Sequence, residues 1–238
     1  MRDITLAILA GGLATGIRPI TNNKAKALIE INGKPFIYWQ LKYYIKQGVK
    51  NFVFLLGFKG EEIEGYIKKN NYFNVNISFY YDGNQLRGTG GSILQSINKF
   101  PENFFVLYGD TLLQIDLNDM YNFYDKNNHQ ITMSIYKNKS MYDKSNVQKL
   151  SHNKITYNKD NLQNDMSYID YGISILNKKI FISNTDKTLT DLSSFYKGIS
   201  SKNKLLGYEV FKRFYEIGSF EGIKQTQSFV KENLSLFE

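Results

Sequence analysis

The stretch that most constrains this chain is residues 4–26, ITLAILAGGLATGIRPITNNKAK. Its apolar run, residues 4–10, ends at Gly11 and Gly12, and a short loop leads on to Lys26. An apolar run of this length bounded by glycines predicts a buried strand of a parallel sheet. Such a strand delivers its loop to the carboxyl edge of the sheet, where open α/β folds bind ligands. Because glycines let backbone N–H groups approach a phosphate and cations neutralise its charge, we predict a phosphate-binding loop.

The next hundred residues alternate between strand-like and helix-like patterns. Apolar residues at four-residue spacing predict a helix between Pro35 and Gly48, and further segments follow the same logic. The expected strands are 51–57, 77–81 and 104–108, and the expected helices are 60–70 and 91–99. This succession predicts an α/β fold with a parallel sheet and right-handed crossovers.

From about residue 129 the pattern changes to short strand-like runs separated by Asn, Asp and Lys turns. These runs, at 131–136, 146–150, 154–158, 169–176 and 205–211, predict a mixed, partly antiparallel half. Asp191 is placed to cap a helix that ends near Gly198, and Ser219 is placed to cap a closing helix that runs towards Leu234.

The amino-acid composition excludes several kinds of site and partner. The chain has 238 residues, of which 42% are hydrophobic, so residues 1–238 can form one domain. The absence of cysteine excludes disulfides, thiolate metal sites and a cysteine nucleophile. The first apolar run is too short to span a membrane and lacks a signal-peptide pattern, so we expect a cytoplasmic protein without membrane contact. Because the lysines behind the net charge of +8 are scattered, we expect no nucleic-acid partner.

Residues 9–21 resemble the signature of sugar-phosphate nucleotidylyltransferases, L-x-G-G-x-G-T-R-L-x-P-L-T followed by P-K. Here the run reads LAGGLATGIRPIT, and Ala25-Lys26 stands where P-K falls. Two departures are that Gly16 replaces the family's arginine and Ala25 its proline. A second glycine-rich run, LRGTGGS at 86–92, is similar to that of the branch with heptose-1-phosphate guanylyltransferases and their uridylyl and cytidylyl relatives.

The resemblance implies a single-domain, Rossmann-like (GT-A-like) fold with a mixed, mostly parallel sheet flanked by helices. Residues 1–128 would form its nucleotide-binding half and residues 129–238 its sugar-phosphate-binding half. It implies an enzyme that joins a sugar 1-phosphate to a nucleoside triphosphate, with Mg²⁺ as cofactor and pyrophosphate as second product. Synthesis of surface polysaccharide is the expected setting, and a homo-oligomer is compatible with the sequence.

Two carboxylates are the predicted metal ligands. The buried run 104–108 ends at Gly109-Asp110, which places a carboxylate at the ligand edge, although an Asp there also caps turns. The segment FYEIGS at 214–219 resembles the family's W-x-D-x-G-T, with Glu216 in the position of the metal-binding Asp. For Glu216, the alternative is a surface residue at a strand end.

The resemblance also assigns the other site residues. Lys26 would balance charge on the reacting phosphates, and Arg18 is the candidate to contact pyrophosphate in place of the missing arginine. The predicted nucleotide-binding residues are Leu9, Ala10, Gly11, Gly12, Thr15, Gln85, Gly88 and Thr89. The predicted sugar-phosphate residues are Lys159, Asp170 and Gly172, of which Lys159 can equally be solvated surface.

Three functional interpretations remain open from the sequence. An active nucleotidylyltransferase comes first. A catalytically impaired nucleotide- or sugar-phosphate-binding protein of the same fold comes second, because family residues are replaced at Gly16, Ala25, Asn158 and Glu216. A dinucleotide-binding Rossmann protein is disfavoured, because its third glycine and the acidic residue about 20 positions on are misplaced.

Overall fold

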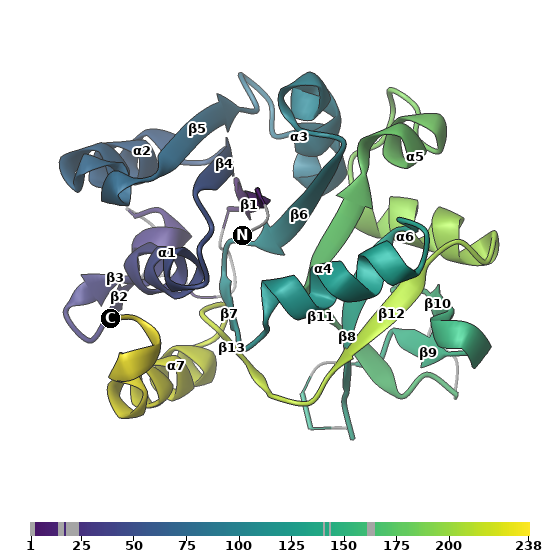
Figure 1. Ribbon diagram of the computed structural model, residues 1–238. Coiled ribbons are helices and arrows are strands. Elements are labelled where there is room, and N and C mark those ends of the chain that lie inside the picture. Colours follow the sequence, from purple (N-terminus) through teal and green to yellow (C-terminus); the bar gives the residue numbers. More distant parts are fainter. Residues whose placement is uncertain (1–2, 14–16, 18–23, 140, 143, 161–164) are drawn as a thin grey trace. The chain divides into compact units, whose positions relative to one another are not determined.

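The computed structural model describes residues 3–13, 17, 24–139, 141–142, 144–160 and 165–238 (Figure 1). The chain divides into two compact units, each built from separated segments. The first comprises Met1–Leu86, Leu107–Leu113 and Phe214–Glu238, and the second comprises Arg87–Val106 and Gln114–Arg213. The prediction of one domain with halves that meet near residue 128 stays a prediction.

The first unit contains a buried parallel sheet. Strand β1 (Thr5–Ala10) pairs in parallel with β4 (Asn51–Leu56), which pairs in parallel with β5 (Asn76–Tyr81). Nearly every residue of β4 is buried, as a strand covered on both faces requires. The predicted parallel succession of strands is confirmed for this unit.

Helices α1 (Phe36–Lys46) and α2 (Gly60–Lys69) connect these strands, and a short hairpin, β2 (Glu30–Ile31) and β3 (Lys34–Pro35), precedes α1. Helix α1 begins directly after Pro35, whose fixed φ suits the entry to a helix. The polar face of α2 carries an ion pair between Lys68 and Glu64, 2.6 Å apart. Both helices were expected from the apolar spacing, and their bounds agree within the usual uncertainty of helix ends.

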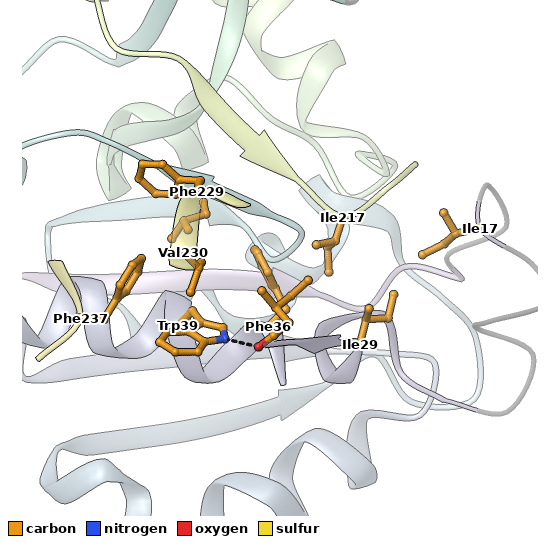
Figure 2. Close-up of a cluster of buried hydrophobic side chains, with 10 residues drawn as sticks. Ile17, Ile29, Phe36, Trp39, Ile217, Phe229, Val230 and Phe237 are labelled. Atoms are coloured by element: carbon orange, nitrogen blue, oxygen red, sulfur yellow. Dashed lines mark hydrogen bonds between the residues drawn. The ribbon is translucent and has the colours of Figure 1, made fainter. Parts of the chain in front are cut away.

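Helix α7 (Phe220–Glu232) packs in the same unit through an aromatic cluster. Figure 2 shows Phe229, Val230 and Phe237 from the C-terminal segment gathered near Trp39 of α1. The buried members of this cluster are Ile17, Ile29, Ile31, Phe36, Trp39, Leu112, Ile217, Phe229, Val230 and Phe237. The Trp39 indole also donates a 2.8 Å hydrogen bond to the Ile31 carbonyl, which satisfies its polar atom inside the cluster.

A second short ladder lies in the first unit, where β7 (Thr111–Leu113) pairs antiparallel with β13 (Phe214–Glu216). The buried side-chain amide of Gln40 donates to the carbonyls of Tyr108 and Thr111, at 3.2 and 2.7 Å. Those carbonyls bracket the turn that follows β6 (Asn103–Tyr108), so a buried polar group fixes this turn.

The second unit is built on a mixed sheet. Strand β8 (Thr132–Lys137) pairs antiparallel with β11 (Tyr168–Asn177) and in parallel with β12 (Leu206–Val210). Strand β9 (Val147–Lys149) pairs antiparallel with both β11 and β10 (Ile155–Tyr157). The predicted mixed, partly antiparallel pattern is confirmed, and with the parallel sheet of the first unit it gives the expected α/β class.

The helices of the second unit include two that the sequence analysis missed. The helices described in this unit are α3 (Gly88–Ser96), α4 (Leu117–Lys126), α5 (Lys178–Ser183) and α6 (Leu192–Ser201), and the two missed are α4 and α5. Helix α4 was not expected, although Asp116 caps it and Leu117, Met120 and Tyr124 give it a buried face. Helix α5 was missed because it is short and follows β11 at once.

Short 3₁₀ turns lie at Lys26–Leu28, Asn71–Asn74, Ile97–Lys99, Ser151–Asn153 and Leu234–Leu236. In the part of the chain that the structure describes, no helix is long and apolar enough to cross a membrane.

Candidate active site

The candidate site lies in the first unit, where the ends of neighbouring strands approach closely. Gly11 follows β1 and Gly57 follows β4, and a Cβ on Gly57 would come within 2.7 Å of the Gly11 carbonyl oxygen. The same carbonyl accepts a 3.2 Å hydrogen bond from the Phe58 N–H. Leu9 and Ala10 are half-buried just before this point, and Gly12 is exposed just after it. Glycine is therefore required here by backbone packing, whatever ligand the loop binds.

Asp82 belongs to the same strand edge, and the sequence analysis missed it. It follows β5 directly, is only 5% exposed, and its Oδ2 lies 3.5 Å from the position that a Cβ on Gly11 would occupy. The signal resembled the one used for Asp110, a carboxylate within two residues of the end of a strand. The alternating burial of β5 hid it, since that strand does not read as a continuous apolar run.

Lys26 and Asp110 meet in this unit although they are far apart in sequence. Lys26 begins the 3₁₀ turn Lys26–Leu28, and Asp110 stands between β6 and β7. The Lys26 ammonium lies 2.6 Å from Asp110 Oδ2, and the two side chains are 20% and 41% exposed. The pairing brings together a cation and a carboxylate that the sequence analysis had assigned separately to phosphate and to metal.

The residue before Lys26 is anchored from helix α2. The buried Ala25 donates its N–H to Glu62 Oε2 at 3.0 Å, and the Glu62 carboxylate also pairs with Lys59 at 3.2 Å. Partial burial raises the pKa of Glu62, but the Ala25 hydrogen bond and the Lys59 charge outweigh it and hold that pKa below its ordinary value. The family's proline at position 25 has no N–H, so this contact depends on the departure to alanine.

Glu216, the last residue of β13, lies near Lys26. Its Oε2 and the Lys26 ammonium lie 2.8 and 3.1 Å from the position that a Cβ on Gly218 would occupy. The Ile217 N–H donates to the Asp110 carbonyl at 3.0 Å, which ties the strand end to the turn that carries the first carboxylate. Lys26 thus lies close to both Gly218 and Asp110, and the roles expected of Lys26, Asp110 and Glu216 stay predictions.

The second glycine-rich run is divided between the units. Its first residue, Leu86, ends a segment of the first unit, whereas Gly88 and Thr89 open α3 in the second. Gln85, just before the run, is exposed and belongs to the first unit. The Thr89 hydroxyl accepts from the Leu192 N–H at 2.9 Å and donates to Asp191 at 3.2 Å. A Cβ on Gly88, whose φ is +72°, would meet the Thr190 carbonyl at 2.4 Å. These glycines therefore serve packing at the start of α3, and a nucleotide-binding role for them stays a prediction.

The predicted sugar-phosphate residues lie in the second unit. Asp170 accepts a 2.9 Å hydrogen bond from the N–H of Gly172, which has a φ of +110° where the register of β11 on β8 shifts. The Asp170 N–H donates to the side-chain oxygen of Asn146 at 3.0 Å. Lys159 is exposed beyond β10. The bulge accounts for Gly172 structurally, and its predicted contact with a sugar stays a prediction.

Three positions of the loop after β1, namely Thr15, Gly16 and Arg18, lie outside the described residues. Among the residues that are described, no group of three or more His, Asp or Glu side chains is arranged to hold a metal ion.

Comparison with known proteins identifies the family. The chain is 27% identical over 225 residues to the D-glycero-α-D-manno-heptose 1-phosphate guanylyltransferase of Aneurinibacillus thermoaerophilus, covering 92% of this chain and 95% of that protein. The protein of the same name from Campylobacter jejuni is 34% identical over 113 residues, covering 48% of this chain and half of that protein.

Solved structures share the fold. HddC from Yersinia pseudotuberculosis, complexed with GMP-PN, superposes with a TM-score of 0.77 at 24% identity, over 95% of this chain and 99% of that one. A putative glucose-1-phosphate thymidylyltransferase from Bacillus anthracis reaches 0.82 at 15% identity, over 96% of both chains. The family model for nucleotidyl transferases matches residues 6–206, which confirms the resemblance, and the chain belongs to the nucleotidyl transferase family.

Proposed function

We propose that this protein joins a sugar 1-phosphate to a nucleoside triphosphate and releases a nucleoside diphosphate sugar and pyrophosphate. The observation that carries this proposal is the 2.6 Å contact of Lys26 with Asp110 in the unit that also holds Gly11. A cation and a metal-binding carboxylate are what the transfer of a nucleotidyl group requires near the phosphates. Family membership and the full-length similarity to a guanylyltransferase support the same reaction.

In the proposed reaction, a phosphate oxygen of the sugar 1-phosphate attacks the α-phosphorus of the triphosphate in line, and pyrophosphate leaves. Backbone N–H groups at Gly11 and Gly12 would bind phosphate oxygens, and Lys26 would neutralise charge that builds up during transfer. The attacking phosphate is already an anion near neutral pH, so no residue of the chain has to act as nucleophile or general base. Arg18 and Thr15 are proposed to contact the same phosphates.

The residues present fit a magnesium ion. Asp110 is 41% exposed and offers oxygen ligands at the end of a fixed turn, and Mg²⁺ usually takes only one or two protein carboxylates together with substrate phosphates. We therefore propose that Asp110 would hold Mg²⁺, which when bound would stabilise negative charge on the transferring phosphate.

Guanine nucleotide and a heptose 1-phosphate are the first substrates to test, because a relative that matches over 95% of its length is named as a heptose 1-phosphate guanylyltransferase. Other relatives are named as uridylyl- and cytidylyltransferases, so the base stays open to test. Gln85, Gly88 and Thr89 are proposed for the base and ribose, and Lys159, Asp170 and Gly172 for the sugar phosphate. A role in surface polysaccharide synthesis in the cytoplasm completes the proposal.

The deciding experiment measures pyrophosphate release with Mg²⁺ across a panel of nucleoside triphosphates and hexose or heptose 1-phosphates. At least one pair should turn over, and Asp110→Asn should lose that activity, whereas Asp119→Asn, an exposed carboxylate of α4, should keep it. If the whole panel gives no pyrophosphate while nucleotide still binds, the protein is the impaired binding protein that the replacement at Gly16 allows.

A further inference from the structure

The side chain of Glu216 turns towards the start of helix α7. Its Oε2 accepts the N–H groups of Gly218 and Ser219, the latter at 3.1 Å, and its Oε1 accepts the Ser219 hydroxyl at 2.5 Å. Both oxygens are thereby engaged by groups that precede or open the helix. A carboxylate at this end also interacts favourably with the positive end of the helix dipole.

Gly222 is the residue that makes room for this arrangement. A Cβ on Gly222 would come within 1.8 Å of Glu216 Oε1 and 2.4 Å of its Cδ, so no side chain fits there while the carboxylate stays. The Gly222 N–H donates to the Ser219 hydroxyl oxygen at 2.9 Å, and that hydroxyl donates a hydrogen bond to Glu216 Oε1. Glu216, Ser219 and Gly222 therefore form one continuous cap on α7.

The cap also fixes the turn that borders Lys26. The Glu216 carbonyl accepts the Thr226 hydroxyl at 3.0 Å, so both the backbone and the side chain of Glu216 are tied to α7. Gly218, held through its N–H, lies against the Lys26 ammonium, which is 3.1 Å from its would-be Cβ. Helix α7 is in turn anchored by Phe229 and Val230 in the buried cluster of Figure 2.

We propose that Glu216 is a positioning residue: its carboxylate caps α7 and holds Gly218 beside Lys26, and Asp110 supplies the protein's carboxylate to the metal. The methylene that Glu has beyond the family's Asp lets the carboxylate fold back over Gly222. This inference rests on the proposed function for its link to catalysis. Its structural part, the cap, stands on the contacts within the first unit alone.

Four variants test the proposal. Glu216→Gln keeps the size of the side chain but replaces one of the two acceptor oxygens with a donor. Gly222→Ala keeps the carboxylate but displaces it, and its Cβ also crowds the Glu216 carbonyl oxygen, 2.7 Å away. Asp110→Asn is the comparison for lost metal binding. Gly65→Ala is the matched control for Gly222→Ala, because Gly65 also lies inside a helix but a Cβ there would meet nothing within 4 Å.

Two measurements separate a cap from a metal ligand. The first is Mn²⁺ affinity in the presence of GTP, followed by electron paramagnetic resonance, together with the Mg²⁺ concentration that gives half-maximal pyrophosphate release. The second is amide hydrogen exchange of the substrate-free protein at residues 218–222, where lost acceptors accelerate exchange.

For Glu216→Gln and Gly222→Ala we expect metal affinity within about twofold of wild type and kcat lower by roughly 10- to 100-fold, the scale of a misplaced reacting group. Exchange at 218–222 should be faster in both, by at least about tenfold, and unchanged in Gly65→Ala. Asp110→Asn should weaken metal binding and leave this exchange unchanged.

Two results would overturn the proposal. One is a loss of metal affinity in Glu216→Gln as large as that in Asp110→Asn, which would make Glu216 a metal ligand. The other is unchanged exchange at 218–222 in both Glu216→Gln and Gly222→Ala, which would remove the cap. If wild type releases no pyrophosphate with any substrate pair, the proposed function fails instead, and the exchange measurement still decides the cap.

Discussion

The ammonium of Lys26 lies 2.6 Å from Oδ2 of Asp110, a contact that spans 84 positions of the sequence. The ion pair is partly exposed, so its direct contribution to stability is small, about 0–1 kcal/mol. Under the proposed function its significance is chemical, because each residue would neutralise the other until charged substrates arrive. The two residues should therefore affect turnover far more than folding.

Replacing Lys26 by methionine should lower kcat by on the order of 10² to 10³, the usual effect of losing one group aimed at transition-state charge. The change keeps the aliphatic stem and removes the charge. The midpoint of urea unfolding should hardly move, since the partner Asp110 is 41% exposed and can be solvated. A variant that retains wild-type kcat would place Lys26 outside the reacting site.

Asp110→Asn should abolish measurable turnover and leave the fold intact. The side chain keeps its shape, and the Gln40 hydrogen bonds that fix its turn involve the Tyr108 and Thr111 carbonyls, which the substitution does not touch. Turnover should be measured over a Mg²⁺ titration beside circular dichroism. Near-full activity at limiting Mg²⁺ in a folded variant would remove Asp110 from the metal site.

Ala25→Pro tests the departure from the family's proline. Ala25 has a φ of −60°, which proline can adopt, but proline cannot donate to Glu62. Loss of the Ala25–Glu62 hydrogen bond destabilises the fold, by an amount that is reduced because Glu62 is 39% exposed to solvent. Proline also makes the unfolded chain stiffer, which stabilises the fold by a smaller amount. The free energy of unfolding should therefore fall by about 0.5–1 kcal/mol. In a Glu62→Gln background, Ala25→Pro should lower the free energy of unfolding by less. Equal losses in both backgrounds would show that the Ala25–Glu62 hydrogen bond does not contribute to stability.

The pH dependence of stability should reveal Glu62. Its folded pKa is held below its ordinary value of 4.5, so its contribution is present above about pH 4.5 and is lost as pH falls through the folded pKa. Urea unfolding of wild type and Glu62→Gln should therefore differ most above pH 4.5 and converge in acid. Parallel pH curves for wild type and Glu62→Gln would contradict the assignment.

The proposed role of the loop after β1 in binding the triphosphate can be tested at Gly16, where the family has arginine. Gly16→Arg should place a cation beside the leaving pyrophosphate and raise turnover, and Arg18→Ala should lower it sharply if Arg18 has taken over that role. Nucleotide affinity measured alongside separates a strained loop, which weakens binding, from an effect on chemistry. Two variants that match wild type in both measurements would move the triphosphate away from this loop.

Much of the fold was predictable because its signals are local. The apolar runs at 4–10 and 51–57 predicted buried parallel strands, and Ser219 predicted the start of α7; all are confirmed. Helix α4 was not predicted although its cap and apolar spacing are present, since only Leu117, Met120 and Tyr124 of its ten residues are buried and polar residues separate them. The division into two units built from separated segments has no local signal at all, because it depends on contacts between distant residues.

The sequence by itself determined the family, the parallel succession of strands in the first unit and the candidate residues Lys26, Asp110 and Glu216, because strand ends and glycine turns are written in consecutive residues. Only the tertiary structure decided what these residues touch. It paired Lys26 with Asp110, joined Ala25 to Glu62, and turned Glu216 back over Gly222, since side-chain direction follows from how elements far apart in the chain pack. The contacts of these side chains therefore depend on neighbours that the local sequence does not specify.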